Sequence, residues 1–370
     1  MIPLGLYVHF PWCIKKCPYC DFNSHELDGD LAEEEYVSTL LEDLQDDASI
    51  FKRPIDSIFF GGGTPSLISP NGFDQFLTEA EYMLPFNENV EITLEANPGA
   101  LDTTHLDGYR QVGINRLSLG VQSFSGRHLK SLGRIHNLDD IARAIGGARS
   151  AGFDNINLDL MHGLPNQNWA DAKIDLMQAI AYEPEHISWY QLTIEPNTLF
   201  YRYPPLLPDE ATLLEIYDKG MELLAQYGYQ RYEISAFCKS NRQSKHNLNY
   251  WRFGDYIGIG SGAHGKYTTG QRVFRTTKTR LPRDYLKDIN KKTTPVPGSE
   301  LLLEYLINAL RLVGGTSLRD FEDRTGLPRN AISDFLQKAQ GMGFIEDFTD
   351  EIVPTQKGLR FVDEALLLLA

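Results

Sequence analysis

Short apolar runs alternate with longer amphipathic stretches over roughly the first 225 residues of the chain. The short runs have the length of buried strands, and the stretches between them repeat with the period of helices. Strands that alternate with helices usually lie parallel, so the pattern predicts repeated βα units around a parallel sheet. The expected strands cover residues 4–10, 55–60, 90–96, 116–122, 155–160 and 186–192, and the clearest helices cover 31–49 and 211–228.

Six units are fewer than the eight of a closed barrel, so we favour an α/β fold built on an open (β/α)6 partial TIM barrel. Periodicity alone leaves a closed barrel and a doubly wound sheet as alternatives. Cysteines follow the first expected strand, a glycine run follows the second, and Glu95, Gln122, Asp159 and Gln191 lie at the ends of the next four. Because barrel active sites form at the carboxyl ends of the strands, these residues are expected to share one rim.

The remainder of the chain departs from the βα pattern. Residues 229–238 predict an extra strand, 245–265 predict a loop, and the proline-containing stretch 289–299 predicts a boundary. Beyond it the pattern predicts helices, a hairpin-like wing at 344–354 and a last helix, which together resemble a winged-helix domain. The expected divisions are a core at 1–228, an added strand and loop region packed on it at 229–290, and a helical winged-helix-like domain at 291–370.

Charge and composition narrow the classes of partner. The net charge of -15 argues against nucleic acid, and the segment 300–370 carries twelve acidic against seven basic side chains. A small or apolar substrate fits better. No apolar run approaches the roughly 18 residues of a membrane span, and no signal-peptide pattern is seen at the start. We therefore expect a cytoplasmic protein without a transmembrane segment.

Three of the four cysteines lie within eight residues, in the stretch "CIKKCPYC". Cys13, Cys17 and Cys20 form C-x3-C-x2-C, whose thiolates can reach three corners of an iron–sulfur cube and leave one iron open. A zinc site competes, but zinc sites usually pair C-x2-C elements, and Cys238 lies more than 200 residues away. Cys238 itself is expected to be a small buried residue. The sequence favours a [4Fe-4S] cluster.

This cysteine spacing at the end of the first strand resembles that of the radical S-adenosylmethionine (SAM) superfamily. The resemblance implies that the open iron chelates the amino and carboxylate groups of SAM and that the cluster delivers an electron to its sulfonium. Tyr19, immediately before the last cysteine, matches the same pattern, and "GGGTP" (61–65) resembles the glycine-rich motif for the SAM amino group. An alternative is a cluster that only stabilises the fold.

Further segments narrow the resemblance to the HemN-type subgroup, the oxygen-independent coproporphyrinogen oxidases and their relatives. These segments are "YVHFPWCIKKCPYCDFNSH", "FFGGGTPS", "LEANPG", "LSLGVQSF" and "NLDLMHGLPNQ", and they cover most of residues 1–200. With Tyr19, the resemblance implies as SAM contacts Tyr7, Gly62, Gly63, Thr64, Glu95, Gln122, Arg134 and Asp159. Gln191 is a less close match, because the residues around it resemble those of the subgroup only loosely.

Two departures separate this chain from the oxidases of that subgroup. Those enzymes carry a further cysteine two residues after the last cluster ligand, where this chain has Phe22. They also carry an N-terminal extension, whereas the first strand is expected here at residue 4. A radical enzyme that acts on coproporphyrinogen III or another tetrapyrrole is therefore the alternative function.

The stretch "HNLNYW" (246–251) points to the favoured function. An imidazole beside aromatic faces suits heme, because neutral histidine ligates iron and flat rings pack on the macrocycle. The pattern H-N-x-x-Y-W also resembles one found in heme chaperones of the same subgroup. The resemblance implies heme contact at His246, delivery of heme to acceptor proteins, and an electron donor for the cluster.

Overall fold

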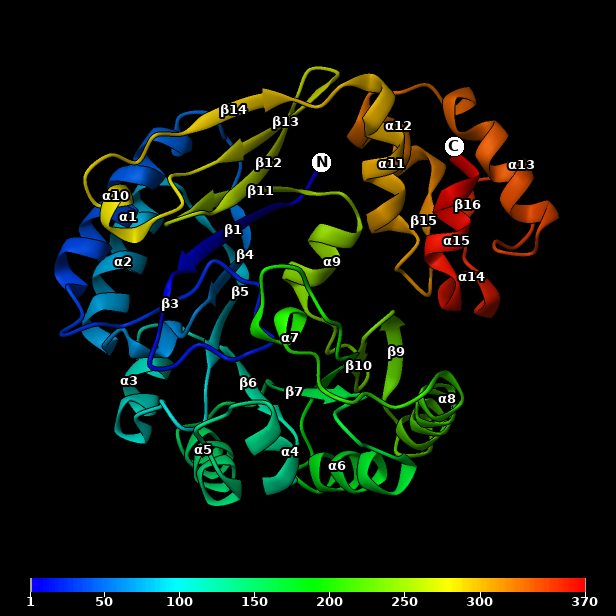
Figure 1. Cartoon of the computed structure of the whole chain (residues 1–370). Coiled ribbons are helices and arrows are strands. Elements are labelled where there is room, and N and C mark those ends of the chain that lie inside the picture. The colour runs from blue at the N-terminus through cyan, green and yellow to red at the C-terminus, as the bar shows by residue number, and fades with distance from the viewer. Residues whose placement is uncertain (1, 370) are drawn as a thin grey trace.

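The computed structural model describes residues 2–369, and its central feature is one curved, twelve-stranded sheet (Figure 1). The strand order is β14-β13-β12-β11-β1-β4-β5-β6-β7-β8-β10-β9. Neighbouring strands from β11 to β8 run parallel, whereas those at both ends of the sheet run antiparallel. The six expected barrel strands are β1 (Leu4–Phe10), β4 (Ile55–Gly62), β5 (Phe86–Ala96), β6 (Arg116–Gln122), β7 (Ile156–His162) and β8 (His186–Gln191).

These six parallel strands confirm the open (β/α)6 barrel. The strands β1 and β6 have the predicted bounds, and the other four differ from theirs by a few residues at one or both ends. The helices lie around the outside of the curve (Figure 1). They are α1 (Glu33–Ala48), α2 (Pro70–Met83), α3 (Leu106–Gln111), α4 (Gly126–Ser131), α5 (Leu138–Ser150), α6 (Trp169–Ala181) and α8 (Glu210–Gln226).

Several of these helices begin where the sequence supplies a capping side chain. Asn137 and Asp140 form a capping box at α5, and Asn168 and Asp171 form another at α6. Asp209 accepts a hydrogen bond from the backbone of the first turn of α8. Each cap satisfies backbone N–H groups that have no partner within the helix, which fixes the helix start.

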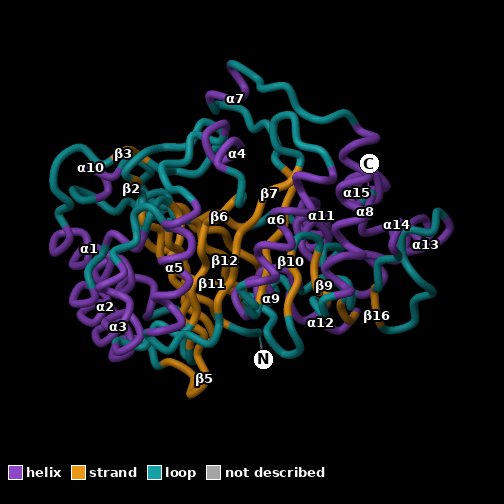
Figure 2. Tube along the Cα trace, turned by 90° about the horizontal axis from the view of Figure 1, so that it is seen from below, coloured by secondary structure: helices purple, strands orange, loops and turns teal. Residues whose placement is uncertain are grey.

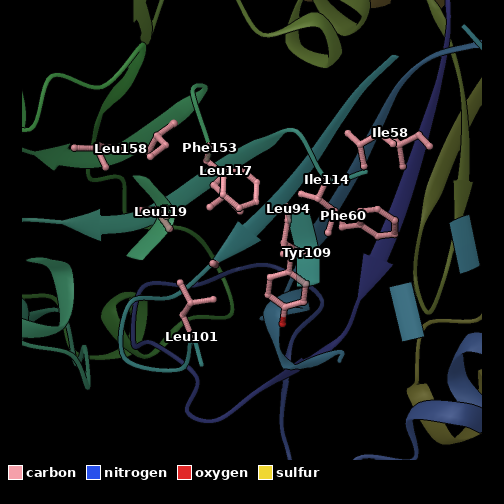
Figure 3. Packing of buried hydrophobic residues seen from close by; sticks show 14 of the residues in the cluster. Ile58, Phe60, Leu94, Leu101, Tyr109, Ile114, Leu117, Leu119, Phe153 and Leu158 are labelled. Carbon is pink, nitrogen blue, oxygen red and sulfur yellow. The ribbon is translucent and has the colours of Figure 1, made fainter. Parts of the chain in front are cut away.

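Side chains along each strand point alternately outward and inward, so the two faces of the sheet differ in composition. Side chains such as Ile58, Phe60, Leu94 and Leu117 point outward and form the main core with the helices (Figure 3). Successive residues of a strand face opposite sides, so their neighbours point into the curve of the sheet. These inward residues are largely polar or aromatic, which makes the interior of the barrel, rather than its outer face, the place for a ligand. They include Tyr7, His9, Phe59, Glu91, Glu95, Arg116, Ser118 and Asp159.

After α8 the chain extends the sheet at both edges. The extra strand expected at 229–238 is present as β9 (Gln230–Glu233) and β10 (Ala236–Cys238), with Cys238 buried as expected. The prediction of a loop at 245–265 is wrong. That stretch forms α9 (Lys245–Trp251), β11 (Asp255–Ile259) and the start of β12 (His264–Thr269). Next come β13 (Arg272–Thr277), α10 (Pro282–Tyr285) and β14 (Lys292–Pro295), which pairs with β13 inside the stretch expected as a boundary.

The C-terminal segment forms helices with a small wing, as predicted. A second buried cluster lies here, and Phe253 and Val273 from the sheet side contribute to it. The wing is a short antiparallel bridge between Ile345 and Pro354, and β15 pairs with β16 beside it. The elements are α11 (Gly298–Ala309), β15 (Thr316–Ser317), α12 (Leu318–Thr325), α13 (Ser333–Gly341), β16 (Glu351–Ile352), α14 (Gln356–Arg360) and α15 (Val362–Leu366). None of the helices within residues 2–369 is long and apolar enough to span a bilayer.

Candidate functional site

The three clustered cysteines lie on a loop at one edge of the sheet. The loop is closed by two short strands, β2 (Trp12–Cys13) and β3 (His25–Glu26), which pair in parallel. Figure 2 shows these strands at the same edge as α4 and α7 (Leu199–Arg202), away from the N-terminus. The thiols of Cys13, Cys17 and Cys20 are not in disulfides, and all three line one cavity of about 500 Å³. We call it the cluster cavity.

Three free thiols around one cavity are the soft donors that an iron–sulfur cluster requires. They come from one loop, so a single segment could wrap the cluster from one side. The donor set and its cavity fit a [4Fe-4S] cluster.

The glycine run lies against this loop. The backbone N–H of Gly63 donates to Phe10 O at 2.6 Å, and that of Thr64 donates to Trp12 O at 2.7 Å. A Cβ on Gly63 would lie 2.4 Å from Trp12 O, and Gly62 adopts a φ of 109°. Side chains are therefore excluded at both positions, because the end of β4 touches the backbone of the cysteine loop. Gly62, Gly63 and Thr64 all line the cluster cavity.

Two buried carboxyl groups line the same cavity. Glu95 accepts a hydrogen bond from Gly62 N at 3.1 Å, and Asp159 accepts one from Ser118 Oγ at 2.8 Å. Burial and the nearby Asp159 raise the pKa of Glu95 to about 8. Burial likewise raises the pKa of Asp159, although hydrogen bonds from Ser118 and Asn157 oppose the shift. Such a pair favours a cationic ligand, which would stabilise the ionised forms.

Arg134 and Gln122 complete the rim next to the cysteines. Arg134 donates from Nη2 to Gly120 O at 2.8 Å, and its Nη1 lies 3.6 Å from Cys17 Sγ. Within the described chain, its buried Nε has no hydrogen-bond partner. Gln122 ends β6 with a φ of 66°, and its Oε1 accepts a hydrogen bond from Tyr190 at 2.9 Å. Both residues line the cluster cavity.

The structure therefore brings most of the predicted SAM residues together. The residues that line the cluster cavity beside the cysteines include Tyr19, Gly62, Gly63, Thr64, Glu95, Gln122, Arg134, Asp159 and Gln191. Tyr7 is separate: it lies in a neighbouring cavity and donates or accepts a hydrogen bond with His9 Nδ1 at 2.7 Å.

Sequence reasoning missed several interior residues. Ser118 and Tyr190 line the cluster cavity and bond to Asp159 and Gln122. Arg116, almost fully buried, lies close enough to Glu95 and Asp159 to lower the pKa of each. The alternation of polar and apolar residues in "RLSLGVQ" is the signal that could have placed Arg116 and Ser118 on the inward face.

A second, larger cavity of about 980 Å³ adjoins the first. Phe22, Gly62 and Glu95 line both cavities, so they form a shared wall. The larger cavity extends from β1 and β4 to the sheet extension, and Asn308 of α11 closes part of it. We call it the aromatic cavity, because its wall includes Tyr7, Phe59, Tyr250, Trp251, Phe253 and Tyr256.

His246 lies one layer behind this wall. Its ring stacks on Phe59 with centroids 4.1 Å apart, and its Nδ1 lies 3.1 Å from Glu91 Oε1. Its side chain is buried, and within the described chain it does not line either cavity. Burial lowers the pKa of His246, so the ring is neutral and donates its Nδ1 proton to Glu91. In this conformation, His246 supports an aromatic wall residue.

With this geometry in place, comparison with known proteins identifies the family. A family model described as "Radical SAM superfamily" matches residues 7–177, and "HemN C-terminal domain" matches residues 296–361. A Haemophilus influenzae protein named "Heme chaperone HemW" is 47% identical and aligns over 99% of this chain and 97% of its own length. The chain belongs to the HemW family of the radical SAM superfamily. The Escherichia coli protein of the same name is 46% identical over 99% of this chain and 98% of its own length.

A solved structure with this fold is that of coproporphyrinogen III oxidase (HemN) from Escherichia coli, which its description calls a radical SAM enzyme. It matches with a TM-score of 0.82 over 100% of this chain and 90% of its own, at 21% sequence identity. The match confirms the fold. Membership of the radical SAM superfamily implies a [4Fe-4S] cluster and SAM, for which the cluster cavity provides fitting residues.

Proposed function

We propose that this HemW family member binds heme and delivers it to acceptor proteins. The observation that carries this proposal is the aromatic cavity, which adjoins the cluster cavity through a shared wall. Its volume of about 980 Å³ is at the upper end of ligand pockets, which is appropriate for a macrocycle. The relatives that are 46–47% identical over almost the whole chain are named heme chaperones, which supports the same function.

The side chains of the aromatic cavity suit both the apolar macrocycle of heme and its charged propionates. Flat aromatic side chains suit the apolar faces of the macrocycle, because they bury large apolar areas against it. Heme also carries two propionates, which pair well with cations. Arg275 and Arg280 line the cavity toward the outer strands and supply such cations.

In the cluster cavity, Cys13, Cys17 and Cys20 would hold the [4Fe-4S] cluster, which supplies a redox-active iron with one open position for SAM. The exposed backbone of Gly62 and Gly63 would approach the amino end of SAM, where side chains are excluded. Glu95 and Asp159 would face its positive charges. Arg134 would contribute a cation that pairs with the carboxylate of SAM. An external electron donor is part of this proposal.

The competing function is oxidation of coproporphyrinogen III. The HemN fold match lies at 21% identity and supports the fold alone. At the position where the oxidases have a further cysteine, this chain places Phe22, whose side chain is 58% exposed and lines both cavities. We infer that Phe22 provides a packing surface for the macrocycle.

Two measurements test the proposed function. Heme titration of the reconstituted protein, followed at the Soret band, should show saturable binding, and bound heme should then move to an apo acceptor protein. Anaerobic incubation of the reduced protein with SAM and coproporphyrinogen III should leave the porphyrinogen unchanged. Failure to bind heme, or formation of protoporphyrinogen, would contradict a purely chaperone role.

The cofactor assignment has a separate test. Replacement of Cys13, Cys17 and Cys20 by serine should abolish the cluster and SAM binding while the circular dichroism spectrum stays unchanged, because these thiols lie on a loop outside the main core. Retained SAM binding in this triple variant would remove the assignment. Cys238→Ser, in the buried strand β10, serves as the matched control and should retain both ligands.

A further inference from the structure

Three histidines lie in or next to the aromatic cavity, and they differ in the availability of their ring nitrogens. His9 lines the cavity, but its Nδ1 lies 2.7 Å from Tyr7 Oη and its Nε2 lies 2.9 Å from Asn23 O. Both nitrogens are therefore occupied. His246 is stacked behind Phe59 and bonded to Glu91. Neither residue can ligate a metal without breaking existing contacts.

His264 is the exception. It is the first residue of β12, its side chain is exposed, and it lines the aromatic cavity. Within residues 2–369, neither of its ring nitrogens has a hydrogen-bond partner, unlike those of His9. Desolvation and the nearby Arg275 and Arg280 lower its pKa, which keeps the imidazole in the neutral form that binds metals.

The cations beside His264 also differ in how far they are already paired. Lys266 donates to Asp255 Oδ1 at 3.0 Å, and Arg275 donates from Nε to Glu304 Oε2 at 2.9 Å. Arg280 is exposed and donates from Nε to the amide oxygen of Asn23 at 3.3 Å. In the part of the chain that the structure describes, it has no carboxylate partner. Arg280 is therefore the cation of this wall that can pair with a new carboxylate without breaking an existing ion pair.

We propose that His264 coordinates the iron of heme bound in the aromatic cavity and that Arg280 pairs with a propionate. This inference rests on the proposed function, because it assigns the groups that hold the same cargo. Phe22 and the aromatic wall would contact the faces of the macrocycle, and His264 with Arg280 would hold its iron and its edge near the cavity mouth. A cargo held by exposed groups is accessible to an acceptor.

The first experiment compares the heme spectra of the full-length wild-type protein, His264→Ala and His264→Gln. Loss of the imidazole should shift the Soret maximum and weaken heme binding by about tenfold or more, in line with the effect of disturbed metal sites. Added free imidazole should restore the wild-type spectrum in His264→Ala. His105→Ala is the control, because His105 is an imidazole of η2 (Thr103–His105) outside both cavities.

The outcomes separate this inference from the proposed function. If the wild-type protein shows no Soret band on titration, the proposed function fails and the ligand assignment fails with it. If the wild-type protein binds heme and both His264 variants, folded by circular dichroism, keep its spectrum and affinity, only the ligand assignment is overturned. His246→Ala should lower affinity through the loss of support for Phe59 and leave the Soret maximum in place; a shift equal to that of His264→Ala would assign the iron to His246 instead.

The second experiment tests Arg280 with heme and its dimethyl ester, which lacks free carboxylates. Wild-type protein should prefer the free acid, and Arg280→Gln should lose most of this preference. Arg283→Gln is the matched control, because Arg283 is exposed in α10 next to Asp284 and does not line the cavity. An equal preference in wild type and Arg280→Gln would overturn the propionate assignment and leave the His264 test unaffected.

Discussion

Glu95 shows how far single residues could be assigned from the sequence. Its position at the end of a predicted strand was enough to place it in the site with Asp159, and the structure brings both into the cluster cavity. Their raised pKa values could not be predicted, because both depend on burial and that of Glu95 also depends on Asp159, which lies on a different strand. Phe22 was noted as a departure from a motif, but its place between two cavities follows only from the fold.

The pKa of Glu95 predicts a pH dependence of SAM binding. With a pKa of about 8, Glu95 is mostly protonated at pH 7, and a cationic ligand favours its ionised form. If SAM binds only protein in which Glu95 is ionised, its affinity should rise by about tenfold between pH 7 and pH 9. The reason is that the fraction of protein with ionised Glu95 rises by that factor. Calorimetry across this range would measure the slope.

Glu95→Gln should reduce that slope, since it removes the titrating group. Any remaining slope belongs to SAM itself or to Asp159. Glu195→Gln is the control, because Glu195 also lines the cluster cavity but does not accept the Gly62 hydrogen bond that Glu95 accepts, and it should leave the slope unchanged. Equal slopes in the wild type and Glu95→Gln would show that Glu95 does not ionise on binding.

At the scale of elements, the regular βα units were predictable and the sheet extension was not. The barrel strands are apolar runs buried on their outer face, so they stand out from the helices between them. In contrast, α9 is seven residues long and β11 contains glycine, so 245–265 carries no clear period. These elements are held by contacts distant in sequence: α9 packs on β1 and β4, and Asp255 N bonds to Pro3 O at 3.1 Å.

Glu91 of β5 fixes the start of α9. Its carboxylate accepts hydrogen bonds from Lys245 N at 2.9 Å, from His246 N at 3.2 Å and from His246 Nδ1. Burial alone would raise the pKa of Glu91, but the bonds from His246 and Lys245 and the charge of Arg116 lower it to about 2. The motif residue His246 is thus tied to a strand glutamate, Glu91, that the motif does not include.

Glu91→Gln should therefore destabilise the protein by about 1–3 kcal/mol at neutral pH, because buried donors lose a charged acceptor. The lowered pKa of Glu91 stabilises the fold above its ordinary value of 4.5, and this contribution is lost as the pH falls toward 2. Thermal melts at pH 7 and pH 3 should show the difference from wild type shrinking at low pH. Glu88→Gln, exposed on the same strand, should show little difference at either pH.

At the scale of the whole molecule, a buried ion cluster joins the first helix to the sheet extension. Lys278, which follows β13, donates to Asp47 Oδ2 at 2.8 Å and to Asp43, and both carboxylates belong to α1. Tyr285 of α10 donates to Asp43 Oδ2 at 2.7 Å. The aromatic cavity is lined by Lys278 of this cluster as well as by Tyr7 of β1. Its shape therefore depends on contacts more than 200 residues apart in sequence.

Lys278→Met should lower the free energy of unfolding by about 3–5 kcal/mol, since it leaves the buried carboxylate of Asp43 without a cation, whereas Asp47 keeps its ion pair with Lys291. Adding Asp43→Asn should recover part of the loss, because one uncompensated charge is removed. Denaturant titration of the single and double variants would measure both effects. The exposed pair Lys219–Glu215 provides the comparison, and Lys219→Met should cost less than about 1 kcal/mol. A similar loss in both lysine variants would contradict a special role for the buried cluster.

The backbone conformation of Gln122 bears on how this protein would respond to selection for heat tolerance. Its left-handed backbone, at an irregularity in the pairing of β6 with β7, costs about 1–2 kcal/mol relative to glycine. Gln122→Gly would relieve this strain, but it would also remove the acceptor of the Tyr190 hydroxyl and give the unfolded chain more backbone freedom, so the melting temperature should change little. The same change removes the amide that Tyr190 holds at the cluster cavity, so it should weaken SAM binding. Selection for heat tolerance should therefore leave Gln122 in place, although glycine would suit its backbone better.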